Sequence, residues 1–91
     1  MTIAPDAQAV ADEIRGAWPN SSSKPAPTGP EFEAFCGVVA RLRDAQRRLS
    51  SEGPIIADPK GNPIPHPALA IEKSCAEQLR RWGARFDPPR R

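Results

Sequence analysis

Apolar residues recur at helical spacing in three parts of the chain, and the first part is residues 6–18. Apolar side chains there return every three or four residues, which is the pattern of a short amphipathic helix. Pro19 ends the pattern, because a proline disfavours helical geometry in the residue before it. Residues 19–29 are rich in Ser, Pro and Gly and are predicted to form a linker. We therefore expect a separate N-terminal helix that is only loosely attached to the rest.

A longer helix is predicted from about residue 30 to residue 51. Thr28 and Glu31 have the spacing of a capping box, and Pro30 suits the first turn. An a/d pattern then lasts three heptads, with Gln46 as its one polar member, and its apolar members are Phe32, Phe35, Val39, Leu42 and Leu49. A seam this regular needs a partner helix, either within the chain or from a neighbouring subunit.

A small β-hairpin is predicted over residues 55–64, after Gly53-Pro54 ends the second helix. Ile55-Ile56 suits a strand, and Asp58-Pro59-Lys60-Gly61 has the residues of a type I turn. Two further prolines, Pro63 and Pro65, limit the length of the returning strand. A hairpin this short is marginal alone and has to lean on the helices.

A third helix is predicted over about residues 67–84, with Pro67 in its first turn. Its apolar stripe consists of Ala68, Ile71, Cys75, Leu79, Trp82 and Phe86. Asp87-Pro88 then has the residues of a new N-cap and first turn. The expected fold is mainly α, an antiparallel helical hairpin with a short β-hairpin insert and a separate N-terminal helix. Its parts are a helix (1–18), a linker (19–29) and a helical domain (30–91).

Composition limits the functions that this chain can have. It has 91 residues, of which 38% are hydrophobic, so the core of a single chain is thin and self-association is expected. Two cysteines and one histidine exclude a disulfide framework and a structural zinc site. We expect neither a signal peptide nor a membrane span, and hence an intracellular protein. No phosphate loop, acidic metal cluster or Ser-His-Asp set is present in the sequence, so no cofactor, metal or catalytic residue is expected.

Basic residues concentrate towards the end of the chain. Residues 53–91 carry seven basic and four acidic groups, whereas residues 1–52 carry six and seven. Arginine forks bind phosphate oxygens well, and the terminal candidates for DNA contact are Arg80, Arg81, Arg85, Arg90 and Arg91. A second set on the middle helix is interspersed with acids, so a solvated helix face is the alternative there, and its members are Arg41, Arg47 and Arg48.

The only histidine lies in the proline-rich stretch GNPIPHP, residues 61–67. A catalytic base or metal ligand needs a positioned partner, and neither Asp58 nor Glu72 forms a recognisable motif with His66. We expect instead a structural joint, in which His66 and Pro67 turn the hairpin into the third helix. Cys36 lies beside an apolar stripe and is expected to act as a small buried hydrophobe rather than as a nucleophile. Both tryptophans are expected to be core or interface anchors.

The order of features in residues 30–91 forms a pattern of its own. The helix sequence FCGVVARLRDAQRRL is followed by a Gly-ended turn, a short hairpin, His66-Pro67, another helix and a close rich in Pro and Arg. This order resembles the small subunit of phage terminases, whose family pattern closes with Leu-Thr-Pro-Ser-Ser-Arg. The corresponding residues here are Phe86, Asp87, Pro88, Pro89, Arg90 and Arg91. The proline and the last arginine match, Asp87 is a good N-cap like the threonine, and Pro89 and Arg90 depart from the serines.

The resemblance implies a part in viral genome packaging within the host cytoplasm. Such subunits form rings, bind viral double-stranded DNA and deliver it to the large terminase subunit, which supplies the ATPase and nuclease. The resemblance assigns structural roles to His66, Pro67, Asp87 and Pro88. The candidates for the oligomer interface are Phe32, Phe35, Val39, Leu42, Leu49 and Trp82. Two alternatives stay open, a small helical homo-oligomeric regulatory protein without DNA binding and a small enzyme that uses Cys36 or His66.

Overall fold

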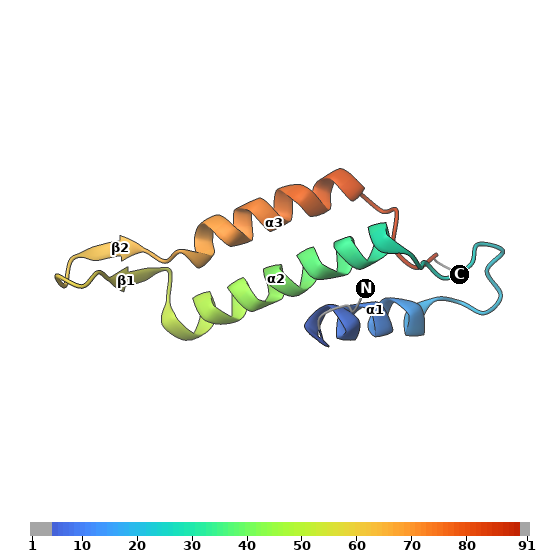
Figure 1. Cartoon of the computed structure of the whole chain (residues 1–91), viewed down its shortest axis with the longest axis horizontal. Coiled ribbons are helices and arrows are strands. Elements are labelled where there is room, and N and C mark those ends of the chain that lie inside the picture. Colours follow the sequence, from blue (N-terminus) through green and yellow to red (C-terminus); the bar gives the residue numbers. More distant parts are fainter. Residues whose placement is uncertain (1–4, 90–91) are drawn as a thin grey trace.

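The middle helix organises the whole molecule. The computed structural model describes residues 5–89, and its elements are α1 (Pro5–Ala17), α2 (Pro30–Glu52), β1 (Ile55–Ala57), β2 (Pro63–Pro65) and α3 (Ala68–Trp82). The helices α1 and α3 both pack on α2, and the β-hairpin continues beyond one end of the α2–α3 pair (Figure 1). This arrangement confirms the predicted mainly α fold.

The molecule is elongated. Its extents are 57 × 27 × 20 Å and its radius of gyration is 16.3 Å, against about 12 Å for a compact chain of this length. Two features explain this shape. The helix α2 is long, and the hairpin projects past both helices rather than folding back over them (Figure 1). The hairpin therefore exposes much of its surface, and the core lies at the opposite end of the helices.

Three phenylalanine rings form the centre of the core. The ring centroid of Phe86 lies 5.0 Å from that of Phe35 and 5.4 Å from that of Phe32, and Phe35 meets Trp82 edge-on at 5.5 Å. The buried residues of α1 close the cluster from the other side, and they are Ala7, Val10 and Ala11. Residues from both ends of the described chain thus share one core with α2.

The expectation that the N-terminal helix is only loosely attached is wrong. Besides its buried alanines and Val10, α1 carries Glu13, which forms an ion pair of 2.7 Å with Arg43 of α2. The linker is also held, because the indole Nε1 of buried Trp18 donates a hydrogen bond to the carbonyl oxygen of Lys24 at 2.9 Å. Composition predicted an irregular segment after α1, but it did not predict that α1 itself packs on α2.

The predicted capping box at the start of α2 is also wrong. Gly29 is the N-cap, and no side chain caps this end. The carboxylate of Glu31 is instead occupied by residues far along the chain, because it accepts a hydrogen bond from the indole of Trp82 and one from Arg85. A long-range contact has therefore replaced the local one, which sequence spacing alone suggested.

The β-hairpin matches its prediction closely. The strands pair antiparallel with Ile56 opposite Ile64, and the N–H of Gly61 donates to the carbonyl of Asp58 at 2.9 Å, which closes the turn. The carboxylate of Asp58 also accepts from the backbone N–H groups of Lys60 and Asn62, at 2.9 and 2.8 Å. Gly61 has φ of 87°, a left-handed conformation that glycine adopts without a steric penalty.

The end of α3 differs from its prediction. The helix ends at Trp82, and the N–H of Gly83, whose φ is 57°, donates to the carbonyls of Leu79 and Arg80. No helix begins at Asp87 within the described residues. Instead, the N–H of Asp87 donates to the carbonyl of Ala84 at 3.1 Å in a turn. This turn directs Phe86 into the core. Burial of the Phe86 ring therefore outweighs the tendency of Asp87-Pro88 to begin a new helix.

Candidate nucleic-acid interface

The last turn of α3 carries two adjacent exposed arginines, Arg80 and Arg81. Within residues 5–89 neither forms an ion pair, so both guanidinium groups have open donors. The negative end of the helix dipole stabilises cations in the last turn, and this alone is sufficient to explain why arginines occur there. The two side chains are nevertheless free to reach an anion outside the chain.

Arg85 shares a shallow hollow with Arg81 at the same end of the molecule. The hollow has a volume of about 370 Å³ and is lined by Glu31, Gln78, Arg81, Trp82 and Arg85. Arg85 is paired with Glu31, so part of its charge is neutralised within the chain. The remaining terminal candidates, Arg90 and Arg91, lie outside the described residues.

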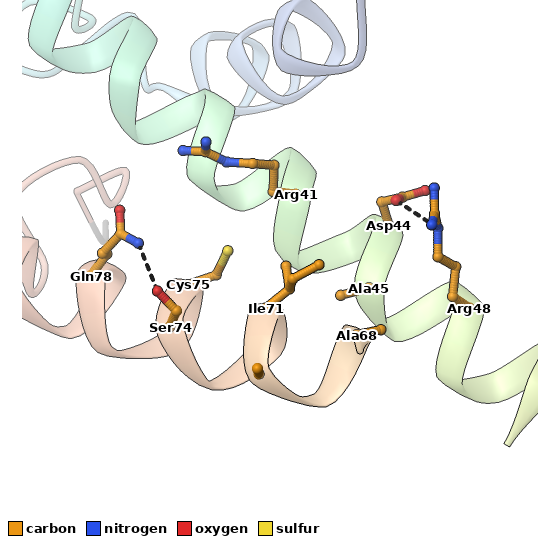
Figure 2. Close-up of a pocket in the computed structure, with 10 residues that line it drawn as sticks. Arg41, Asp44, Ala45, Arg48, Ala68, Ile71, Ser74, Cys75 and Gln78 are labelled. Atoms are coloured by element: carbon orange, nitrogen blue, oxygen red, sulfur yellow. Dashed lines mark hydrogen bonds and ion pairs between the residues drawn. The ribbon is translucent and has the colours of Figure 1, made fainter. Parts of the chain in front are cut away.

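Two arginines of α2, Arg41 and Arg48, border a groove between α2 and α3, as Figure 2 shows. The groove has a volume of about 460 Å³, and small or apolar side chains line much of it, namely Ala45, Ala68, Ala70, Ile71 and Cys75. Arg41 and Arg48 extend from its α2 side, while Ser74 and Gln78 lie on the α3 side and are hydrogen-bonded to each other (Figure 2).

One carboxylate on α2 pairs with two arginines of the same helix. Asp44 pairs with Arg47 at 3.1 Å and with Arg48 at 3.0 Å, one turn apart on α2. Arg41 forms no ion pair within residues 5–89. The α2 set is thus partly neutralised, as its sequence neighbours indicated, and Arg41 is its most available member.

His66 occupies the joint between the hairpin and α3, and its side chain is only 8% exposed. Its ring Nδ1 accepts a hydrogen bond from the backbone N–H of Ala68 at 2.9 Å, and its Nε2 lies 3.4 Å from a carboxylate oxygen of Glu52. The backbone N–H of His66 also donates to the carbonyl of Pro54 at 2.8 Å. Together the three contacts join the start of α3, the last residue of α2 and the segment before β1 at His66.

The cysteines are buried and lie in different parts of the α2 packing. Cys36 belongs to the core, where burial first and the neighbouring charge of Glu33 second raise the pKa of its thiol. Cys75 is buried on α3 and borders the groove. A raised thiol pKa lowers the thiolate fraction, which disfavours nucleophilic chemistry. Within residues 5–89, no three His, Cys, Asp or Glu side chains come together as metal ligands.

The residues expected at a subunit interface divide into two groups. Phe32 and Phe35 are 3% and 8% exposed and face the chain's own core, so for them the partner of the helical seam lies within the chain. The other members are only partly buried, and they are Val39, Leu42, Leu49 and Trp82. Leu42 and Leu49 lie about 100° around α2 from the groove arginines. Ala45, which lines the groove, is three residues from Leu42 and four from Leu49, so both leucines lie beside the groove on the same side of α2.

Comparison with known proteins identifies one family. A family model described as phage terminase, small subunit, matches residues 28–87, which is more than half of the chain. The match includes the helical hairpin, the β-hairpin and Arg80, Arg81 and Arg85, and it ends before Pro88. No curated protein and no solved structure gives a significant match. Within the described residues, no helix is long and apolar enough to cross a membrane.

Proposed function

We propose that this chain, which belongs to the phage terminase small subunit family, is the oligomeric DNA-binding adaptor of a genome-packaging motor. In this role it binds viral double-stranded DNA in the host cytoplasm and brings it to the large subunit. The large subunit supplies the ATPase and nuclease activities, and the present chain catalyses no step. The family match over residues 28–87 carries the proposal, and the distribution of charge supports it.

The proposed DNA contact centres on Arg80 and Arg81. They are exposed, adjacent and without an ion-pair partner in residues 5–89. Neutralisation of backbone phosphates by arginine releases condensed counterions, and this sequence-independent term supplies most non-specific affinity. Two arginines on one chain give a weak contact, but an oligomer repeats it once per subunit. Arg41 is the next candidate, whereas Arg47, Arg48 and Arg85 first have to leave their carboxylates.

The proposed contact between subunits uses the partly buried face of α2. Val39, Leu42 and Leu49 are incompletely covered by the chain's own helices, and a neighbouring copy that covers them gains roughly 25 cal/mol for each Å² of apolar surface removed from water. Arg41 is exposed and lies about 100° around α2 from Leu42. Trp82 lies nearer the core, where its ring packs against Phe35.

A pair of matched variants tests the DNA contact. Arg80→Gln with Arg81→Gln removes two charges from the proposed surface, and Arg15→Gln with Lys24→Gln removes two charges elsewhere. We expect the first variant to bind a fluorescent DNA duplex at least about tenfold more weakly at ~0.1 M salt, and with a shallower salt dependence. The control should bind nearly as wild type does. Equal losses in the two variants would contradict the assignment, and absence of any duplex binding by the wild type would favour a regulatory protein that does not touch DNA.

A further inference from the structure

The two edges of the β-hairpin are chemically different. Hydrogen-bonded and non-hydrogen-bonded pairs alternate along an antiparallel ladder. The N–H of Asp58 donates to the carbonyl of Asn62, and the N–H of His66 donates to the carbonyl of Pro54. The pair Ile56–Ile64 lies two residues from each of these pairs and is therefore also a hydrogen-bonded pair. The pairs on either side, Ile55–Pro65 and Ala57–Pro63, therefore direct their backbone groups outward, away from the other strand.

Only one of these edges is able to accept a further strand. On β2 both outward positions are prolines, Pro63 and Pro65, and a proline has no N–H to donate. On β1 the outward positions are Ile55 and Ala57, and each offers an N–H and a carbonyl. Within residues 5–89 the sheet has two strands only, so no other segment of the described chain covers the β1 edge.

We propose that the β1 edge is a self-association site and that its occupant is the β1 strand of a second copy of this chain. The two strands run antiparallel about a twofold axis that passes between Ile56 and the partner's Ile56. Ile55 then pairs with the partner's Ala57, and Ala57 pairs with the partner's Ile55. Every outward N–H and carbonyl of Ile55 and Ala57 is satisfied in this register, and the two hairpins form one four-stranded sheet.

Side-chain burial favours the same arrangement. Ile55 is 56% exposed, and alternation along the strands places it on one face of the hairpin with Ala57, Pro63 and Pro65. The pairing brings Ile55 beside the partner's Ala57, so this face becomes a continuous apolar strip. Cross-strand contacts of this kind stabilise sheets. An exposed hydrophobic strand edge otherwise invites uncontrolled association, and the prolines of β2 prevent growth beyond the pair.

Charge at the ends of the hairpins also fits a second copy. Because the strands are antiparallel, the turn of each hairpin reaches the end of the partner's α2. The turn carries Lys60, and the partner's Glu52 lies at the end of that helix with a side chain that is 54% exposed. The two helical bodies lie at opposite ends of the sheet, since each hairpin projects beyond its own helices (Figure 1). The contact is independent of DNA binding.

Twofold pairing joins copies two at a time and does not close a ring by itself. A ring built through the α2 face would therefore be joined to a second ring through its hairpins. Without the α2 contact, the hairpins alone give a dimer. In either case, loss of the hairpin contact halves the mass of the particle, and this ratio is the quantity to measure.

Ala57→Pro removes the outward N–H of β1 and leaves the hydrogen bonds between β1 and β2 intact. Ala57→Val keeps the N–H and serves as the matched control. Light scattering at equal concentrations should give wild type and the valine variant twice the mass of the proline variant, with equal helical circular dichroism for all three. An unchanged mass for a folded proline variant, or a wild type that stays monomeric up to ~1 mM, would overturn the proposal.

Hydrogen exchange of the wild type covers the case in which the proline variant misfolds. The amides of Ile55 and Ala57 should become more protected as protein concentration rises, because they are hydrogen-bonded only in the pair. Exchange at the unprotected rate at every concentration would contradict the proposal. Duplex binding by the same samples is read separately, so a failure of the DNA-binding role and a failure of the hairpin contact give different results.

Discussion

The imidazole Nδ1 of His66 accepts the backbone N–H of Ala68 at 2.9 Å, and this hydrogen bond caps α3 from outside the helix. The residue at the formal N-cap is Pro67, whose side chain offers no acceptor. The geometry, a side chain that accepts from the N–H two residues ahead, is the one that Asn and Asp use in turns. A histidine that is fully engaged in this way explains why the only histidine of the chain lies between prolines.

Replacement of His66 should therefore affect stability rather than chemistry. His66→Ala removes the cap and leaves the N–H of Ala68 without its partner, and we expect the free energy of unfolding to fall by about 1–2 kcal/mol. His66→Asn should recover much of that loss, because its side-chain oxygen is able to accept from the same N–H. Urea unfolding followed by circular dichroism measures both changes. An asparagine variant no more stable than the alanine variant would show that the cap is unimportant.

Phe86 should be one of the most sensitive positions in the chain. Its ring contacts Phe32 and Phe35 and is 8% exposed, so Phe86→Ala is expected to cost about 3 kcal/mol. Because α1 closes the same cluster, hydrogen exchange in α1 should accelerate as well. Ile71→Ala is the control, since Ile71 is 45% exposed. If the two variants unfolded at the same urea concentration, the position of Phe86 at the centre of the core would be contradicted.

The attachment of α1 should weaken in acid. A hydrogen bond from Arg43, and then its charge, lower the pKa of Glu13 from its usual value of 4.5. A carboxyl group with a lowered pKa in the folded chain stabilises that state at pH values above 4.5, and the contribution disappears as pH falls through the lowered value. Glu13→Gln should thus reduce the difference in melting temperature between pH 7 and pH 3. An undiminished difference would show that this pair does not couple α1 to pH.

The two thiols should be protected in the folded chain. Cys36 is 0% and Cys75 is 3% exposed. Burial also raises the pKa of the Cys36 thiol, which lowers its thiolate fraction. We expect slow alkylation by iodoacetamide at pH 7.5 and rapid modification of both residues after addition of urea. Mass spectrometry of the alkylated chain gives the sites. Fast native labelling of Cys36 would contradict the packing of α1 against α2, because α1 helps to enclose the core that holds this residue.

Local sequence signals predicted the elements well. Helical spacing gave the middle helix to within a residue of Pro30–Glu52, and the order Asp58, Pro59, Gly61 gave the turn. These signals succeed because their physical causes, such as the fixed φ of proline and the conformational freedom of glycine, act within a few residues. The pairs that Asp44 forms with Arg47 and Arg48 are likewise local and follow from helical spacing.

Long-range contacts account for the errors. Glu31 serves Trp82 and Arg85, residues more than fifty positions away, instead of capping its own helix. Trp18 holds the linker, and α1 joins the core through Ala7, Val10 and Ala11, contacts that no local sequence signal specifies. Phe86 turns into that core, so Asp87 starts no helix in the described residues. For the proposed DNA contact, the sequence supplied the candidate arginines, but only the structure separates those that are paired with carboxylates from those that are not.

The salt dependence of duplex binding by the wild-type protein tests the proposed function most directly. Fluorescence anisotropy with a labelled duplex, at salt concentrations from about 50 to 200 mM, gives the slope of log K against log salt. If Arg80 and Arg81 of each bound subunit meet phosphates, the slope should be about −2 or steeper, since each neutralised phosphate contributes about −0.9. A slope near zero, or no binding at the lowest salt, would contradict the role of this chain as a DNA-binding packaging adaptor.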